Sequence, residues 1–154
     1  MTRYTKRFNE LNIGDVALVG GKNASLGEMY NQLSAKGIQV PNGFATTAAA
    51  FWHFIDSNNL RKSLEQLFSR LDKTAFTNLT EVGAIARKLL YNAKMPPDLE
   101  TEIISDYKEL QATGVSEVGV RSSATAEDLQ QASFAGQHES YLNIKGHPAL
   151  VDAV

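Results

Sequence analysis

The chain has 154 residues, a net charge of −2 and no cysteine. This length predicts about one domain with a buried core, and the missing cysteines exclude disulfides, thiolate metal sites and cysteine nucleophiles. The near-neutral charge provides no basic field to attract nucleic acid. No apolar run approaches the ~20 residues of a membrane span, and MTRYTKRFNEL lacks the apolar core of a secretory signal. We therefore expect a cytoplasmic protein that binds neither nucleic acid nor membrane.

The first part of the chain predicts short extended segments between amphipathic helices. LNIGDVALVGGKN is short and broken by glycine, which indicates a brief extended piece leading into a glycine turn. Helical periodicity, with Leu26, Met29 and Leu33 on one face, follows over 23–36 and stops at Gly37. VPNGFAT predicts a turn and a very short strand. Thr46 or Thr47 can then cap a helix that breaks near residues 57–59.

Three further helices are predicted in the middle of the chain. Apolar residues at helical spacing start near Leu60, behind Asn78 and at Pro96-Pro97. Asn78 and Glu81 have the spacing of a capping box, in which each side chain would bind a backbone N–H of the first turn. The third helix carries acidic side chains that we expect to form a solvated face: Glu100, Glu102, Asp106 and Glu109.

Near the C-terminal end, the spacing of the apolar residues changes from helical to alternating. Apolar and polar residues alternate over 118–121 and 138–144, which predicts two strands. The elements together predict an α+β fold, with helices packed with a small, mostly antiparallel sheet. The last residues, HPALVDAV, place apolar side chains at helical spacing without a cap or polar tail. We therefore expect residues 1–154 to be part of a longer protein.

The first candidate site is VGGKNASLGEM, residues 19–29. Gly20 and Gly21 permit a close approach that a side chain would prevent. The loop offers its amides at a predicted helix N-terminus, which favours an anion, and Lys22 adds a mobile positive charge. It is not a Walker A loop, because Val16 stands at the first glycine position and Asn23 follows the lysine. A phosphate would suit this loop; a plain tight turn with a solvated Lys22 is the alternative.

The second candidate site follows the predicted strand at Arg121. The guanidinium is a planar fork that pairs with two phosphate oxygens at once. Neighbouring hydroxyls and amides could form an anion-binding nest: Ser122, Ser123 and Thr125. Glu127 and Asp128 could orient Arg121, bind a metal or cap a helix. The alternative is a turn in which Arg121 pairs with one of these two carboxylates.

A third stretch, Phe134-Ala135-Gly136-Gln137, suggests a bend where a ligand comes close, or equally a plain hairpin turn. The three histidines, His53, His138 and His147, do not have the spacing of metal ligands. No residue of the chain is therefore assigned as a catalytic group or a metal ligand.

Three motifs carry a resemblance to a known family. GGKNASLGEM, VPNGFATTAAAF and VRSSATAEDLQQASFAGQHESYLNI closely resemble the N-terminal nucleotide-binding domain of the pyruvate, phosphate dikinase family, over roughly residues 10–154. VPNGFATT and the asparagine after Lys22 favour its pyruvate, water dikinase subfamily. The residues after Val-Arg-Ser usually differ from the SATAEDL stretch of this chain in pyruvate, phosphate dikinases. Rifampicin phosphotransferases have a stretch that is much closer to it. Gln130-Gln131 replaces a frequent Pro-Asp, a surface-loop change that should not affect phosphate chemistry.

The resemblance implies an ATP-grasp fold, in which ATP lies between two subdomains and this chain is the first. The family's loop lysine corresponds to Lys22 and its Val-Arg-Ser arginine to Arg121, and both are expected to contact ATP phosphates. The full set of nucleotide-binding residues is expected to be Gly20, Gly21, Lys22, Arg121, Ser122, Ser123, Thr125, Gly136 and Gln137.

The resemblance also implies what the complete enzyme does. It would convert ATP, pyruvate and water to phosphoenolpyruvate, AMP and phosphate through a phosphohistidine on a later domain, with pyruvate bound beyond this chain. The Mg²⁺ ligands and much of the adenine pocket would also lie past Val154, and such a half domain could form a homodimer. One alternative is the ATP-binding domain of a related phosphotransferase, of the pyruvate, phosphate dikinase or rifampicin phosphotransferase type. The other is a non-catalytic module that binds a nucleotide or a partner. The enzyme reading requires Lys22 and Arg121, about 100 positions apart, to reach one triphosphate.

Overall fold

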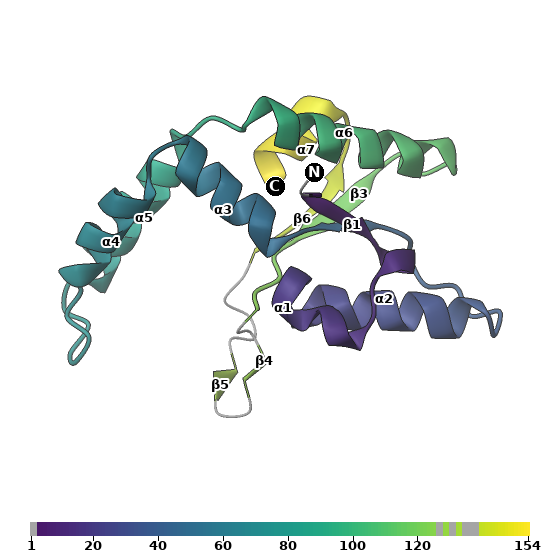
Figure 1. Cartoon of the computed structure of the whole chain (residues 1–154), viewed down its shortest axis with the longest axis horizontal. Helices are drawn as coiled ribbons and strands as arrows, with labels where there is room; N and C mark the ends of the chain where they lie inside the picture. Colours follow the sequence, from purple (N-terminus) through teal and green to yellow (C-terminus); the bar gives the residue numbers. More distant parts are fainter. Residues whose placement is uncertain (1–2, 126–127, 130–131, 134–138) are drawn as a thin grey trace. The chain divides into compact units, whose positions relative to one another are not determined.

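The computed structural model describes residues 3–125, 128–129, 132–133 and 139–154. The chain divides into two compact units, one within residues 1–51 and 97–154 and the other within residues 52–96. Helices dominate both, and the described strands form antiparallel pairs. The predicted α+β class is confirmed, and Figure 1 shows the elements in chain order.

The first unit begins with a two-stranded pair. β1 (Thr5–Arg7) runs antiparallel to β2 (Phe44–Thr46), with Thr5 opposite Thr46. Between them come two 3-10 turns (Phe8–Glu10 and Ile13–Asp15), α1 (Val16–Val19) and α2 (Gly21–Ser34). The first core cluster joins these elements through Phe8, Leu11, Val19, Ala24 and Ala45. The predicted strand in VPNGFAT is confirmed.

The segment before Gly20 is helical, so the predicted extended piece is wrong. The reason is a local capping box. The Asn12 side chain accepts a hydrogen bond from the Gly14 N–H at 2.9 Å, and the Asp15 side chain accepts one from the Asn12 N–H at 2.8 Å. These bonds satisfy the first amides of a helical turn, which then continues into α1.

The predicted helix over 23–36 is confirmed as α2. Leu26 of the expected apolar face packs against the first core cluster, but the fully buried residues of the helix are others. Gly21, Ala24 and Gly27 are buried, whereas Met29 is largely exposed. An ideal Cβ on Gly27 would lie 2.4 Å from Leu11 Cβ and 2.9 Å from its carbonyl oxygen. Small residues at helical spacing thus let the chain before α1 pack directly on the helix backbone.

We expect Gly27→Ala to destabilise the protein by about 1–3 kcal/mol, because the added methyl overpacks the contact with Leu11. The measurement is the midpoint of urea unfolding. Gly83→Ala is the matched control, since there the nearest atom is the flexible guanidinium end of Arg87 at 3.4 Å. Because Gly83 lies in the interior of a helix, where alanine is favoured over glycine, Gly83→Ala should stabilise the protein by up to about 1 kcal/mol. Equal effects of the two substitutions would contradict the packing explanation.

The rest of the first unit comes from the C-terminal part of the chain. α6 (Pro97–Ala112) is followed by β3 (Val118–Arg121), which pairs antiparallel with β6 (Ser140–Ile144), as Figure 1 shows. β4 (Asp128–Leu129) and β5 (Ala132–Ser133) form a short pair between them. α7 (His147–Ala153) follows β6. The two predicted strands and the helical pattern of HPALVDAV are thereby confirmed.

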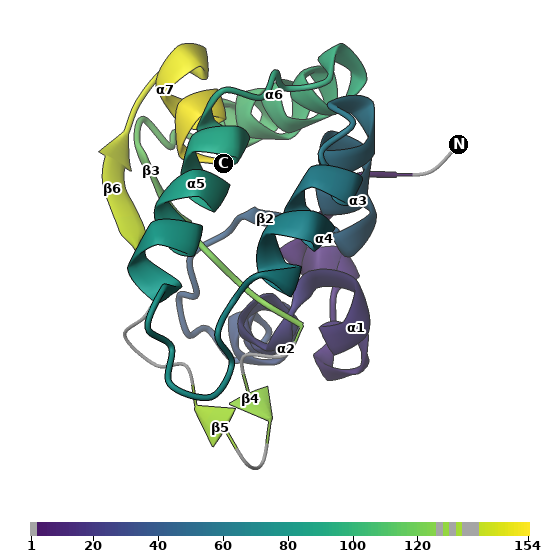
Figure 2. The ribbon, with the colours of Figure 1, turned by 90° about the vertical axis from the view of Figure 1, so that its left-hand side faces the viewer.

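The second unit is mainly a helical pair. α3 (Ala48–Ser57) starts at Thr47, whose hydroxyl accepts a hydrogen bond from the Ala50 N–H at 3.2 Å, and it leads into residues 52–96. There α4 (Arg61–Ser69) packs against α5 (Leu79–Tyr91) through Leu67, Val82 and Ala86. Figure 2 shows these two helices and the loop that joins them. The helices expected from the periodicity are present.

The predicted capping box at Asn78 is wrong. The Asn78 side chain makes no capping bond to α5. It accepts a hydrogen bond from the Asp72 N–H at 2.9 Å and donates one to the Arg70 carbonyl at 2.8 Å. The amide therefore closes the loop between α4 and α5, a role that spacing alone does not distinguish from a cap.

Asp72 holds the same loop together through hydrogen bonds, and its contribution to stability depends on pH. Its carboxylate accepts hydrogen bonds from the Ala75 N–H, the Thr77 hydroxyl and the Thr74 N–H, which lower the pKa of Asp72 from 3.8 to about 2. Because this pKa is depressed in the folded state, the carboxylate stabilises the fold above pH 3.8. That contribution is lost as the pH falls from there towards 2.

We expect the difference in unfolding free energy between the wild type and Asp72→Ala to be constant above about pH 5 and to shrink below about pH 4. Urea unfolding of both proteins at a series of pH values, from above about pH 5 down to about pH 2, would measure this difference. A difference that stays constant through this range would show that the carboxylate charge does not stabilise the loop.

Candidate functional site

The two polar loops singled out from the sequence meet in the first unit. The Lys22 ammonium donates a hydrogen bond to the Ser122 carbonyl oxygen at 2.9 Å. The Asn23 N–H donates to Ser123 Oγ at 3.4 Å. Gly20 packs against the same segment, since an ideal Cβ on it would lie 2.3 Å from Ser123 Oγ. Residues about 100 positions apart in sequence therefore form one surface.

Glycine is required at position 20 for two reasons. Its φ of +83° lies in a region that side chains disfavour, and the space next to its Cα is filled by Ser123 and the Ala124 carbonyl. The Gly20 N–H donates to the Val16 carbonyl, and its own carbonyl accepts from the Ala24 N–H. Gly20 thus ends α1 and starts α2 at a sharp turn, with Lys22 in the first turn of the new helix.

Arg121 approaches the same place from the sheet. It is the last residue of β3, pairs with Ser140 of β6 and is exposed. Its backbone position is therefore set by the antiparallel pair, and the next residue carries the carbonyl that holds Lys22. Ser122 and Thr125 are exposed, whereas Ser123 is half-buried against the turn at Gly20.

Part of the predicted site lies outside the described residues. Glu127, Gly136 and Gln137 belong to this part, so their expected roles stay predictions. Asp128 lies in a strand, which makes its suggested role as a helix cap wrong. The alternative pairing of Arg121 with Glu127 or Asp128 stays a prediction.

The charges of the site favour an anion. α2 has 14 residues and no acidic residue in its first turn. Its N-terminus carries the equivalent of about half a positive charge from the aligned peptide dipoles. Lys22 and Arg121 add two full positive charges on the two loops that meet there. This combination of backbone amides, a helix dipole and two cations is typical of phosphate binding.

The residues that the structure describes contain neither a cluster of metal-ligating side chains nor a helix that could span a membrane. Within 3–125, 128–129, 132–133 and 139–154, no group of three or more His, Asp or Glu is placed to hold a metal ion. No helix in these same ranges is long and apolar enough to cross a membrane. The Mg²⁺ ligands expected beyond Val154 stay a prediction.

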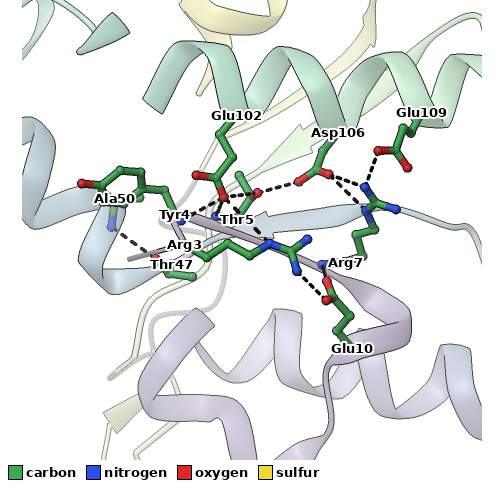
Figure 3. Close-up of polar contacts among 10 residues, drawn as sticks. All are labelled: Arg3, Tyr4, Thr5, Arg7, Glu10, Thr47, Ala50, Glu102, Asp106 and Glu109. Carbon is green, nitrogen blue, oxygen red and sulfur yellow. Dashed lines mark hydrogen bonds and ion pairs between the residues drawn. The ribbon is translucent and has the colours of Figure 1, made fainter. Parts of the chain in front are cut away.

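A second polar cluster, which the sequence reading missed, joins β1 to α6 and is drawn in Figure 3. Glu102 Oε1 accepts hydrogen bonds from the Tyr4 and Thr5 N–H groups, both at 2.9 Å. The Thr5 hydroxyl lies 2.8 Å from the same oxygen and 2.5 Å from Asp106 Oδ2. The Arg7 guanidinium binds Asp106 Oδ1 at 3.0 Å.

The expectation of a solvated acidic face on α6 is therefore wrong for Glu102 and Asp106. Asp106 is only 5% exposed. A signal was present in the sequence, because Thr5 and Arg7 share one face of a strand while residues 102, 106 and 109 share one face of a helix. Two complementary polar faces can pair, but only the tertiary structure shows that they do. This cluster lies on the side of β1 that faces α6.

The fold and site define an α+β domain whose two cationic loops meet at a helix N-terminus, the arrangement of an anion-binding domain. Residues 16–154 match the family described as the pyruvate phosphate dikinase AMP/ATP-binding domain, and the chain belongs to that family. This result confirms the resemblance that the three motifs indicated.

Named relatives agree with this assignment. The chain is 50% identical over 154 residues to the phosphoenolpyruvate synthase of Synechocystis sp., an alignment that covers 95% of this chain and 19% of the relative. It is 45% identical over 148 residues to that of Escherichia coli, covering 96% and 19%. It is 44% identical over 152 residues to that of Helicobacter pylori, covering 97% and 19%. The chain thus spans about a fifth of the length of these relatives.

Proposed function

We propose that this chain forms the phosphate-binding wall of the ATP site in a phosphotransferase of the phosphoenolpyruvate synthase type. The observation that carries the proposal is the meeting of the two cationic loops, with Lys22 Nζ 2.9 Å from the carbonyl that directly follows Arg121. Membership of an AMP/ATP-binding family and the names of the relatives support the choice of ligand.

Each loop has a distinct task in this proposal. Lys22 exchanges a neutral carbonyl for a charged phosphate oxygen, which makes a shorter and stronger hydrogen bond. Arg121 offers two parallel N–H groups to the same phosphate chain. The Gly20-Gly21 turn brings backbone amides close, and the exposed hydroxyls of Ser122 and Thr125 add donors. Phosphoryl transfer depends mainly on such positioning and on neutralising developing charge.

The wider proposal concerns the complete protein. There the domain is the first half of an ATP-grasp fold, and the enzyme acts in the cytoplasm. ATP, pyruvate and water give phosphoenolpyruvate, AMP and phosphate through a phosphohistidine on a later domain. Bound Mg²⁺ would neutralise phosphate charge, with its ligands and the pyruvate site outside this chain. Gly136 and Gln137 remain proposed nucleotide contacts, and self-association into a homodimer remains a proposal too.

The proposal is tested by calorimetric titration of the chain with three compounds: Mg-ATP, inorganic tripolyphosphate and adenosine. If the chain supplies the phosphate wall, ATP and tripolyphosphate bind with affinities within about tenfold of each other, a span of 1.4 kcal/mol. Adenosine should release no heat. Binding of adenosine without tripolyphosphate would assign this chain to the base instead, and absence of binding by all three would contradict a phosphate wall held by these residues.

A further inference from the structure

The helix that carries Lys22 lacks a cap of its own. The residue before its first turn is Gly20, which has no side chain to accept a hydrogen bond. A serine, threonine or aspartate at this N-cap position usually accepts from the N–H of the second or third helical residue. With Gly20 as the N-cap, the third helical residue is Asn23.

A serine from another part of the chain takes the place of that cap. Ser123 Oγ accepts a hydrogen bond from the Asn23 N–H at 3.4 Å. The same oxygen occupies the space in which a Cβ on Gly20 would lie, at 2.3 Å from the ideal position. The hydroxyl therefore lies on the side of Gly20 from which a local capping side chain would extend. The hydrogen bond is longer than the usual N–H···O distance of about 2.9–3.0 Å, and the close packing of Ser123 at Gly20 is a second, independent contact.

We infer that Ser123 caps α2 from a distance of 100 residues and is a positioning residue of the phosphate site. It holds the loop that follows Arg121 against the first turn of α2, where Lys22 lies. The Lys22 bond to the Ser122 carbonyl is a second tie between the same two segments. The spacing between the two cations is thereby set before a nucleotide arrives, which lowers the cost of binding.

Ser123 was expected among the nucleotide ligands, whereas here its oxygen is engaged with the Asn23 N–H. The positioning role rests on the proposed function, because it concerns the affinity for phosphate. The cap does not rest on it, because the Ser123–Asn23 contact is present without a ligand.

The cap is tested first, without nucleotide, by NMR hydrogen exchange at the Asn23 amide. We expect Ser123→Ala to speed exchange by about three- to tenfold, in line with the loss of a helix cap. Ser123→Thr keeps the hydroxyl and should restore slow exchange. Ser116→Ala, at an exposed position before β3, is the control and should leave the Asn23 amide unchanged. Unchanged exchange in Ser123→Ala would overturn the inference.

The positioning role is tested next with tripolyphosphate. Ser123→Ala should weaken its binding by about tenfold and Ser123→Thr should restore it. In the wild type the Asn23 amide should stay protected when tripolyphosphate binds. Loss of that protection on binding would mean that the hydroxyl turns to the phosphate, and would overturn the positioning role. If the amide responds to Ser123→Ala but no variant binds tripolyphosphate, the cap stands, and both the positioning role and the proposed function fail.

Discussion

Replacing Lys22 and Arg121 together with alanine is expected to abolish the binding of Mg-ATP. Each side chain is proposed to make at least one hydrogen bond to a charged phosphate oxygen, an interaction that contributes about 1.5–3 kcal/mol. Either single substitution should therefore weaken binding by about 10- to 150-fold, and the double substitution should remove it from the range of calorimetry. Because the two cations act on one phosphate chain, their effects are not expected to be independent.

The control for this experiment removes the same two charges elsewhere. Lys36, beyond the end of α2, and Arg87, on α5, are both exposed. The double variant Lys36→Ala/Arg87→Ala has the same net charge as the site variant and should bind Mg-ATP as the wild type does. Equal loss of binding in both would indicate a general charge effect. A large fall in the melting temperature of Arg121→Ala would instead indicate that Arg121 belongs to a structural ion pair.

The second large effect is expected from Asp106→Ala, which should destabilise the fold by about 2–4 kcal/mol. Asp106 is 5% exposed and contacts both the buried Thr5 hydroxyl and the Arg7 guanidinium. Its removal leaves Thr5 with Glu102 alone and leaves Arg7 without its buried partner. For a chain of this length the melting temperature should fall by about 5–15 °C.

Glu109→Ala is the matched control, because Glu109 pairs with the same guanidinium. The Glu109 hydrogen bond, followed by that of Asp106, raises the pKa of Arg7. The Glu109 side chain is nevertheless 55% exposed, so water screens its attraction and the loss should stay below about 1 kcal/mol. Differential scanning calorimetry of both variants would measure the contrast. Similar losses from the two substitutions would show that burial does not decide the strength of this cluster.

The sequence predicted most elements whose residues carry their own periodicity or stop signal. α2, α6 and α7 follow from apolar spacing, and Gly37 and Gly114 lie in turns with positive φ after α2 and α6. β3 and β6 follow from alternation. The failures occurred where a polar side chain had more than one possible partner. Asn78 has the spacing of a cap and closes a loop instead, and Asn12 and Asp15 start a helix where glycines suggested an extended chain.

The α+β class, the family and the two cationic loops could be predicted from the sequence alone, because these depend on local patterns and on long motifs in a fixed order. How distant residues combine became clear from the folded structure. It placed the Lys22 ammonium on the Ser122 carbonyl, set Ser123 against Gly20 and buried Asp106 against Thr5 and Arg7. The physical reason is that a hydrogen bond or a close contact depends on distance in space. Partners about 100 positions apart leave no periodic signal in the chain between them.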